Sequence, residues 1–442
     1  MIPILTCAAM READARAVAQ RGSDALVEAA GTAVGLEAKR LLRSCYGARV
    51  AVLVGPGLNG ADGRVASRWL KSRGAQVELI EWDHAPTLLR GHDLVIDAAF
   101  GTGCSRPFTA PKVTPGTLVL AVDLPSGVDT DSGALLGEPM SADVTLALGA
   151  MKPAHLEGRS TDFVGELRFA GLGIVKTFDD GLVDDKDLNS IIRYSAHDHK
   201  WVHAVQAFAG STLMPGAAEL VLRGALAGGA SMIRLASRGD VSALVQLPPE
   251  VVHTTDLGVD PRCRAVVAGP GLGTSAWTWL RERMANVEVP VVLDADGLDR
   301  PSIDEFSPRN DSWILTPHEG EFARLTGQPL GLNRFDAVRD LARATQCVVL
   351  LKGPTTVIAN GTGALRVINS GTSALATAGS GDVLSGLIVA TVARGHDPFN
   401  AAALAAHLHG RAGGRLQPYA SATDVVVKIR EILGELDRNE NI

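Results

Sequence analysis

Short apolar runs that end in glycine-rich loops, each followed by a helical pattern, constrain this chain more than any other feature. The run from Arg49 to Val54 ends in the loop GPGLNGADG, after which come a helical stretch and a second apolar run, QVELIEW. Strand, glycine loop, helix and strand in that order form the βαβ unit of a parallel sheet. The second half of the chain repeats this order with different loops. The sequence therefore predicts an α/β protein built on parallel sheets.

The length of the chain and an acidic segment near its middle predict two domains. At 442 residues the chain exceeds one ordinary core, because domains commonly hold ~100–200 residues. The acidic segment FDDGLVDDKDLN (178–189) separates two sets of apolar runs, so a boundary is expected between there and Lys200. We expect one α/β domain over residues 1–195 and a second over residues 196–442.

The expected elements follow from the apolar runs. A helical opening is expected over residues 8–42, and the prolines of residues 101–116 argue against a crossover helix there. In the second half the segments TTVIAN and ALRVIN predict a hairpin, and helices are expected near residues 382–394, 399–416 and 423–436. The strands expected in that half are VHAVQAFA, SMIRLA, RAVVAG, VPVVLDADG, SWILTP and CVVLLKG.

Charge, hydropathy and cysteine usage exclude several classes of function. The 42 basic and 49 acidic residues give a net charge of −7 without a long block of one sign, which argues against a nucleic-acid binder. No apolar stretch approaches the ~18 residues of a membrane span, and the N-terminus lacks a secretion signal. The five cysteines are odd in number and include no Cys-x-x-Cys pair. We therefore expect a cytoplasmic protein without a structural zinc site or a disulfide framework.

The segment AGSGD (378–382) before an apolar helix is the strongest chemical signal of the second half. Glycines at a helix start leave N–H groups uncovered, and the helix dipole adds positive potential, so the segment predicts an anion site. Asp382 there is placed to accept a hydroxyl proton while the amides hold a transferring phosphoryl group. The alternative is that Asp382 merely caps the helix. The five residues alone leave both interpretations open.

Other strand-end loops favour the phosphate interpretation. LKGPTT (351–356) offers a lysine and two hydroxyls to a phosphate tail, and TPHEGE (316–321) also follows a strand. Ligands of open α/β sheets bind at such carboxyl ends. Asp294 and Asp296 are either carboxylates for a magnesium–phosphate complex or turn formers.

Together the segments DADGLD, TPHEGEFARLTG, LKGPTTVIAN, LATAGSGDVLSGLI and AAHLHGRAG resemble the NAD(P)H-hydrate dehydratase family. The resemblance implies a ribokinase-like α/β fold. It also implies that hydrated NADH or NADPH, (S)-NADHX or (S)-NADPHX, is phosphorylated at its ring hydroxyl with Mg²⁺ and that phosphate is then lost. Bacterial members of the family use ADP and eukaryotic members use ATP. The order of the two domains on this chain resembles that of bacterial members and therefore favours ADP.

The same resemblance implies site residues in the second half. Asp382 is the implied base and contacts the hydrate, and Gly381 contacts the nucleotide phosphate. The implied hydrate-contacting positions are Ala217, Gly271, His318 and Asp382. The implied nucleotide loop consists of Lys352, Gly353, Pro354, Thr355 and Thr356. A family glycine is replaced by Ala209, and a loop glycine expected nearby is absent.

In the first half, Asn59, Asp97 and Asp123 each follow an apolar run. If the sheet is parallel, the three side chains converge on one edge and favour a binding site over simple turns. The glycine loop before the first helix also indicates phosphate binding, although it lacks the G-x-G-x-x-G spacing.

These motifs, with ADVTLALGAMKPAHL, resemble the NAD(P)HX epimerase domain, which implies a Rossmann-like three-layer fold. The implied potassium ligands are Asn59, Asp97 and Ser126. Asp123 is the implied acid/base group and also contacts the hydrate. The other implied hydrate contacts are Leu58, Asn59, Gly60, Ala61, Asp62, Gly101, Thr102, Gly103, Cys104, Ser105, Arg106 and Pro107.

Three functions are consistent with these motifs. The first is a bifunctional repair enzyme in which the epimerase makes both epimers available to the dehydratase. The second is a ribokinase-like alcohol kinase, which would not account for the front domain. The third keeps the dehydratase but makes the front domain non-catalytic, because Leu58 and Ala61 replace the asparagine and glycine of the family pattern. A homo-oligomer is expected, since ribokinase-like sheets commonly assemble.

Overall fold

The structure is a computed structural model that describes residues 1–104, 106–192, 199–254, 258–284, 287–298 and 311–440. It divides into two compact units. The N-terminal unit consists of Ile2–Asp179, and the C-terminal unit consists of Asp180–Ile442 together with Met1.

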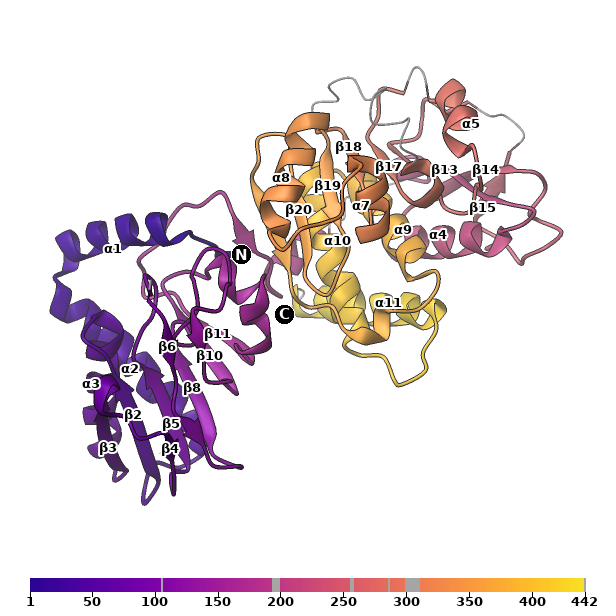
Figure 1. Cartoon of the computed structure of the whole chain (residues 1–442). Coiled ribbons are helices and arrows are strands. Elements are labelled where there is room, and N and C mark those ends of the chain that lie inside the picture. Colours follow the sequence, from indigo (N-terminus) through magenta and orange to yellow (C-terminus); the bar gives the residue numbers. More distant parts are fainter. Residues whose placement is uncertain (105, 193–198, 255–257, 285–286, 299–310, 441–442) are drawn as a thin grey trace. The chain divides into compact units, whose positions relative to one another are not determined.

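A parallel six-stranded sheet forms the centre of the N-terminal unit (Figure 1). Its order is β11-β10-β8-β5-β2-β3, and all neighbouring strands are parallel. The strands are β2 (Arg49–Val54), β3 (Gln76–Glu81), β5 (Leu94–Ala98), β8 (Leu118–Val122), β10 (Val144–Leu148) and β11 (Glu166–Ala170). The loops that follow β2, β5, β8 and β10 therefore lie at the same edge of the sheet.

Helices cover one face of this sheet, and short strands with loops cover the other. Val34 of α2 (Ser23–Leu42) and Leu70 of α3 (Leu58–Lys71) pack with Ile96 in the core of the first face. Phe108 and Met140 pack on the second face. The short strands on this face are β4 (Leu88–Leu89), β6 (Phe108–Thr109), β7 (Lys112–Val113) and β9 (Gly137–Glu138), and the two-residue strand β1 (Ile2–Pro3) is not part of this layer. The third layer of this unit is thus largely irregular.

The helical opening is two helices. α1 (Cys7–Arg21) is capped by Thr6, whose hydroxyl accepts a hydrogen bond from the amide of Ala9, and α2 follows after Gly22. Gly22 has a φ of +83°, a conformation that glycine adopts without strain and that interrupts a helix. The described residues of 101–116 form no helix, as the prolines predict. They contain the strands β6 and β7 instead.

The C-terminal unit holds a larger sheet whose strands run in the order β12-β21-β20-β19-β18-β17-β16-β13-β14-β15. The pairs β19–β20 and β20–β21 are antiparallel, which confirms the expected hairpin, and the other pairs are parallel. The strands are β12 (Gly181–Leu182), β13 (Ala204–Ser211), β14 (Met232–Arg238), β15 (Val251–His253), β16 (Ala265–Ala268), β17 (Val291–Leu293), β18 (Trp313–Leu315), β19 (Val348–Leu351), β20 (Thr356–Ala359) and β21 (Leu365–Ile368).

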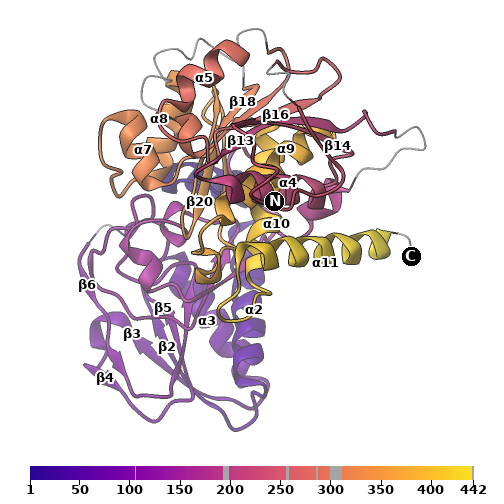
Figure 2. The ribbon, with the colours of Figure 1, turned by 90° about the vertical axis from the view of Figure 1, so that its right-hand side faces the viewer.

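Helices lie on both sides of this sheet (Figure 2). The helices α4 (Pro215–Ala227), α9 (Ser380–Ala393), α10 (Pro398–Gly413) and α11 (Ala422–Glu440) share one core with the sheet. On the other side lie α5 (Ala276–Arg283), α7 (Glu319–Thr326) and α8 (Arg334–Thr345). α9 is buried along nearly its whole length because it lies between the sheet and neighbouring helices.

The two units divide between Asp179 and Asp180, earlier than the expected boundary at 195/196 although inside the expected interval. The acidic segment carries a few apolar side chains, and Val183, Leu188 and Ile191 are buried in the core of the C-terminal unit. Leu182 and its neighbour Gly181 pair with β21. These contacts attach the segment to the second unit.

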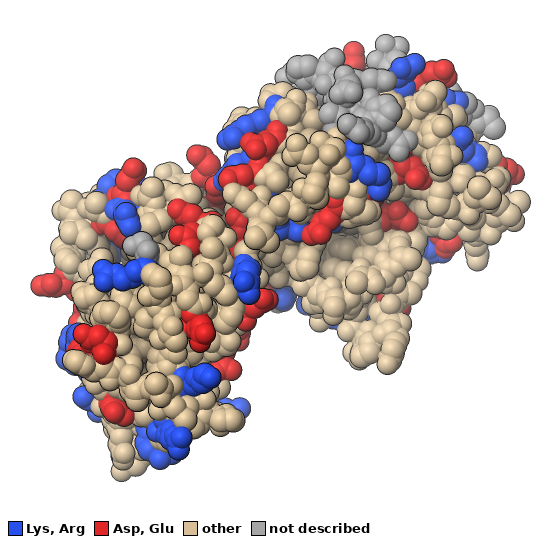
Figure 3. Space-filling model, in the orientation of Figure 1, with Lys and Arg blue, Asp and Glu red and all other residues tan. Residues whose placement is uncertain are grey.

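Acidic and basic side chains of the described residues are interspersed on the face shown in Figure 3. Within the part of the chain that the structure describes, no helix combines the length and the apolar character that a membrane crossing requires.

Candidate active sites

A cavity of about 370 Å³ lies at the carboxyl ends of the parallel strands in the N-terminal unit. The loops after β2, β5, β8 and β10 form its floor, and α1 and α2 contribute apolar side chains such as Met10 and Leu26. The predicted residues that line it are Leu58, Asn59, Asp62, Gly101, Thr102, Gly103, Cys104, Arg106 and Asp123. The parallel sheet thus brings together loops that are far apart in sequence.

Asp123 is held ionised at the centre of this cavity. Its carboxylate accepts hydrogen bonds from the Thr102 hydroxyl at 2.7 Å and the Leu148 amide at 3.1 Å, and it forms an ion pair with the Lys152 ammonium. Burial opposes ionisation, but Lys152 outweighs it, so the pKa of Asp123 is lowered. Its φ of +68° is uncommon for a residue with a side chain.

Lys152 and His155 hold the side chain and the backbone of Asp123 in place. Lys152 is buried, and its ammonium also donates to the carbonyls of Leu148 at 2.8 Å and Ala150 at 3.0 Å. His155 Nδ1 accepts from the Lys152 amide at 2.9 Å, so Nε2 carries the proton and donates to the Asp123 carbonyl at 2.6 Å. Burial lowers the pKa of His155 to about 4, which keeps the ring neutral.

The potassium candidates form a polar group beside the cavity. Asp97 is fully buried, and its carboxylate accepts from the Ser126 hydroxyl at 2.6 Å and the Ser126 amide at 2.9 Å. Burial raises the pKa of Asp97. The Nδ2 atom of Asn59 is buried without a hydrogen-bond partner among the described residues. Neither Asp97 nor Ser126 lines the cavity itself.

Three of the predicted contacts of this unit lie outside the cavity wall, and a fourth is not described. Gly60, Ala61 and Pro107 do not line the cavity, and Ser105 lies outside the described residues. At Gly60 a Cβ atom would lie 1.9 Å from the carbonyl oxygen of Gly55, so this glycine permits the close approach of α3 to the end of β2. Its role in the structure is packing within the loop.

A second cavity, of about 1050 Å³, lies at the carboxyl ends of the strands in the C-terminal unit. The loops after β18 and β19, the first turn of α9 and the middle of α10 form its walls. The predicted residues that line it are His318, Lys352, Gly353, Pro354, Thr356, Gly381 and Asp382. The backbone of Thr355 belongs to the same loop, but this residue is not on the wall.

Asp382 lies in the first turn of α9. Gly379 precedes the helix with a φ of +84°, and no side chain caps the helix start. Burial, followed by the negative charge of Asp294, raises the pKa of Asp382 to about 7, although Lys352 opposes the shift. A carboxyl group with a pKa near neutrality at a helix N-terminus is suited to accept a proton beside a bound anion.

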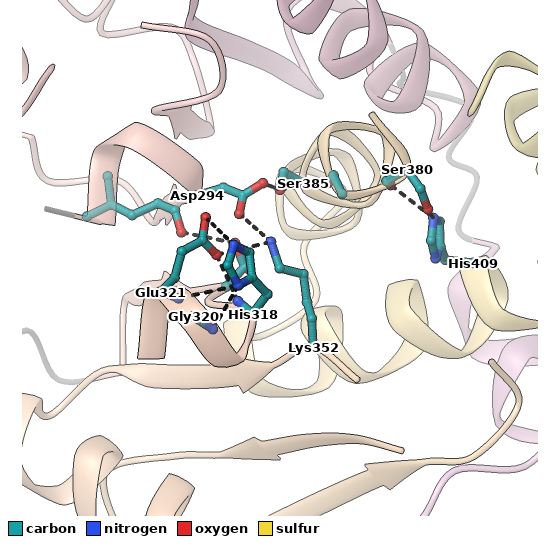
Figure 4. A network of polar contacts seen from close by, with 11 residues as sticks. Asp294, His318, Gly320, Glu321, Lys352, Ser380, Ser385 and His409 are labelled. Atoms are coloured by element: carbon teal, nitrogen blue, oxygen red, sulfur yellow. Dashed lines mark hydrogen bonds and ion pairs between the residues drawn. The ribbon is translucent and has the colours of Figure 1, made fainter. Parts of the chain in front are cut away.

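Lys352 is oriented by two buried carboxylates (Figure 4). Its ammonium lies 2.8 Å from Asp294 Oδ1 and 3.6 Å from Glu321 Oε2. The Ser385 hydroxyl donates to the other oxygen of Asp294 at 2.6 Å. Each oxygen of Asp294 therefore accepts one hydrogen bond, which ties the carboxylate to Lys352 and Ser385. The carboxylate of Asp296 accepts a hydrogen bond from the Gly273 amide at 2.8 Å, so it connects two loops that are distant in sequence instead of forming a local turn.

His318 and Glu321 cap the N-terminus of α7 reciprocally. His318 Nδ1 accepts from the Gly320 amide at 2.9 Å, and the Glu321 carboxylate accepts from the His318 amide at 2.8 Å. This pair fixes the orientation of the ring at the cavity wall (Figure 4). Ala217 and Gly271 pack against each other, since a Cβ at Gly271 would lie 2.6 Å from Ala217 Cβ, and neither lines this cavity.

Several residues of both sites escaped the sequence interpretation. Lys152, His155 and Asp14 belong to the first cavity or its support, and Glu321, Ser385 and His409 to the second. Lys152 had a usable signal, because it is a lone charge in the apolar segment LGAMKPA after a strand. His409 lies in the segment AAHLHGRAG, but the sequence did not indicate its role. In the structure burial lowers the pKa of His409 to about 4, and its Nε2 contacts the Ser380 carbonyl at 3.1 Å.

Comparison with known proteins agrees with this geometry. The family model described as NAD(P)H-hydrate dehydratase matches residues 205–434, and the model described as YjeF-related protein N-terminus matches residues 23–92 and 81–154. The ADP/ATP-dependent NAD(P)H-hydrate dehydratase of Bacillus subtilis, co-crystallised with ATP and Mg²⁺, is 28% identical. The two structures superimpose with a TM-score of 0.52. The match covers 57% of this chain and 97% of the Bacillus subtilis chain.

A ribokinase-like superfamily protein of Enterococcus faecalis, 19% identical, gives a TM-score of 0.55 over 59% of this chain and 98% of that one. The C-terminal unit therefore has a ribokinase-like fold. The bifunctional NAD(P)H-hydrate repair enzyme of Mycobacterium tuberculosis is 34% identical over 89% of this chain and 90% of its own length. The chain belongs to the family of bifunctional NAD(P)H-hydrate repair enzymes, which confirms the expected family and fold class.

Proposed function

We propose that the C-terminal unit dehydrates (S)-NADHX and (S)-NADPHX, using ADP or ATP. The observation that carries this proposal is the common cavity of Asp382 and Lys352, in which a carboxyl group with a pKa of about 7 lies at a helix N-terminus near a buried ammonium group. Asp382 takes the proton of the ring hydroxyl while the hydroxyl oxygen attacks the terminal phosphorus of the nucleotide. The bond between that phosphorus and the bridging oxygen breaks, and AMP leaves from ADP or ADP leaves from ATP. Phosphate then leaves C6, a proton leaves C5, and the dihydronicotinamide is restored.

The remaining residues bind the two substrates in this proposal. The loop Lys352, Gly353, Pro354, Thr355 and Thr356 holds the nucleotide phosphates together with Gly381. His318, Ala217 and Gly271 are the proposed hydrate contacts, and of these His318 lines the cavity. Asp294 and Glu321 keep Lys352 charged and directed at the phosphates, since the net effect of burial and of these two carboxylates raises the pKa of Lys352.

Mg²⁺ accompanies the nucleotide in the proposed reaction. Among the described residues no group of three or more His, Cys, Asp or Glu side chains is placed to hold a metal ion, so no dedicated magnesium cage is found there. The phosphates of the nucleotide are the expected magnesium ligands, and the proton transfer to Asp382 does not involve the ion.

We further propose that the N-terminal unit epimerises (R)- and (S)-NAD(P)HX at C6, with Asp123 as an acid/base group. Asn59, Asp97 and Ser126 would hold K⁺. Their oxygens suit a hard cation, and the full burial of the Asp97 carboxyl group beside the Ser126 hydroxyl supports this assignment. The ion would supply positive charge beside the pyrophosphate of the substrate.

The location and assembly of the protein remain predictions. All five cysteines are free, which supports the proposed cytoplasmic location. The expected homo-oligomer rests on the ribokinase-like fold, and light scattering on the purified protein tests it.

One assay tests both activities. The protein is incubated with mixed (R)- and (S)-NADHX, Mg²⁺, K⁺ and either ADP or ATP, and the dihydronicotinamide absorption is followed. Complete recovery of NADH supports both activities, and recovery that stops near the (S) fraction supports the dehydratase alone. Absence of recovery, together with phosphorylation of a simple alcohol, would contradict the proposal and favour a kinase.

A further inference from the structure

The cavity of the N-terminal unit contains more titratable groups than the proposed acid/base residue Asp123. Asp14 of α1 and Asp62 of α3 also line it, as does Lys152. Arg11 of α1 lies at the mouth, where its guanidinium would be 2.9 Å from a Cβ at Gly103. Asp62 therefore faces Asp14 from α1, Asp123 from the loop after β8, and Lys152, which neutralises Asp123.

Asp62 is buried in a different environment from that of Asp123. Only 7% of Asp62 is exposed, and among the described residues its carboxyl group makes no hydrogen bond or ion pair of the kind that holds Asp123. A carboxylate buried without donors is destabilised, and the charges of Asp123 and Asp14 add repulsion. Burial, followed by these two charges, accordingly raises the pKa of Asp62 to about 8, so this group keeps its proton at neutral pH.

The two carboxyl groups thus differ in protonation state within one cavity. Asp123 is ionised because Lys152, Thr102 and the Leu148 amide stabilise its charge. Asp62 is neutral because nothing comparable stabilises its charge. Pairs of carboxyl groups whose environments separate their proton affinities serve as acid and base in many enzymes.

We propose that Asp62 is the proton donor and Asp123 the proton acceptor of the epimerase reaction, with Lys152 as a positioning residue for Asp123. This inference rests on the proposed epimerase function and assigns Asp62 a catalytic role beyond substrate contact.

The reaction proceeds by opening the hemiaminal, since C6 of the hydrate carries both the hydroxyl group and the ring nitrogen N1. Asp123 removes the hydroxyl proton, a C=O bond forms at C6, and the C6–N1 bond breaks with its electron pair moving to N1. Asp62 gives its proton to N1. Rotation about the C5–C6 bond presents the other face of the aldehyde, and closure of the ring returns both protons. The step consumes no oxidant and no water, and both aspartates end in their starting state.

The test follows the conversion of (S)-NADHX to the (R) epimer by chromatography, without nucleotide, so that the dehydratase is silent. The Asp62→Asn variant keeps the shape and neutrality of the protonated acid but cannot transfer a proton. We expect its rate above the spontaneous background to fall by about 10²–10⁴-fold. The control, Asp83→Asn on an exposed turn, should match the unmodified protein. A thermal shift on adding NADHX checks that Asp62→Asn still folds and binds.

The pH profile distinguishes a proton donor from a structural residue. The rate of the unmodified protein should decline as the pH rises through about 8, because Asp62 loses its proton there, and the residual rate of Asp62→Asn should lack this decline. If Asp62→Asn keeps the full rate, or if the alkaline decline is absent from the unmodified protein, the assignment of Asp62 is wrong while the epimerase function stands. If the unmodified protein does not exceed the spontaneous rate, the epimerase function itself fails.

Discussion

Asp294 and Asp382 lie in one cavity, yet their environments give them opposite tendencies to ionise. Asp294 is fully buried, but the adjacent Lys352 ammonium and the Ser385 hydroxyl stabilise its charge and lower its pKa. Among the described residues, Asp382 has no hydrogen bond or ion pair of this kind, and burial with the charge of Asp294 raises its pKa to about 7. The ion pair therefore orients the lysine and also tunes the neighbouring base.

The pH dependence of the dehydratase should report on Asp382. A base acts only when it is ionised, so kcat/KM for (S)-NADHX should rise with pH through about 7 and be lost below it. Asp382→Asn should reduce this activity by about 10²–10⁴-fold. Calorimetry should show that ADP binding is retained, and Asp340→Asn on the exposed surface of α8 provides the control. An active Asp382→Asn enzyme would exclude Asp382 as the base.

At the scale of elements, the position of Asp382 depends on how closely α9 approaches α4. A Cβ at Gly386 would lie 2.1 Å from the Val221 carbonyl oxygen, and a Cβ at Gly224 would lie 2.3 Å from that of Val383. The two helices thus touch backbone to backbone, which only glycine permits at these positions.

Gly386→Ala should therefore separate α9 from α4. We expect a loss of about 1–3 kcal/mol in the free energy of unfolding, together with reduced dehydratase activity because the first turn of α9 shifts. Gly434→Ala in α11 is the matched control, since its Cβ would meet only Arg438 Nη1 at 3.9 Å. That change should be stabilising by ~0.5–1 kcal/mol. Urea unfolding measures both, and equal effects of the two substitutions would contradict this packing argument.

At the scale of the whole molecule, each unit carries its own cavity and its own set of proposed catalytic groups. The residues that line the first cavity come from Ile2–Asp179, and those that line the second from Asp180–Ile442. The two activities should therefore be separable by mutation within the intact chain.

Two single variants should show this separation. With mixed epimers, Asp123→Asn should stop NADH recovery near the (S) fraction, because the (R) epimer is no longer converted. Asp382→Asn should give no recovery but should still interconvert the epimers. Mixing the two purified variants should restore complete recovery, since the hydrate diffuses between molecules. If the mixture does no better than Asp123→Asn alone, the sites are not independent.

Local pattern in the sequence was sufficient to predict the α/β class, the hairpin of β20 and β21, and the loops that carry Asp123, Lys352 and Asp382. These features depend on the spacing of apolar residues, on glycine and on position at the end of a strand, all of which are properties of neighbouring residues. The attachment of residues 180–192 to the second core depended on contacts with distant elements. The ionisation of Asp62, Asp294 and Asp382 likewise depended on burial and on charges tens of residues away in the sequence. A carboxyl group's proton affinity is set by the solvent and charges around it in space, and for these residues the folded chain alone supplies those surroundings.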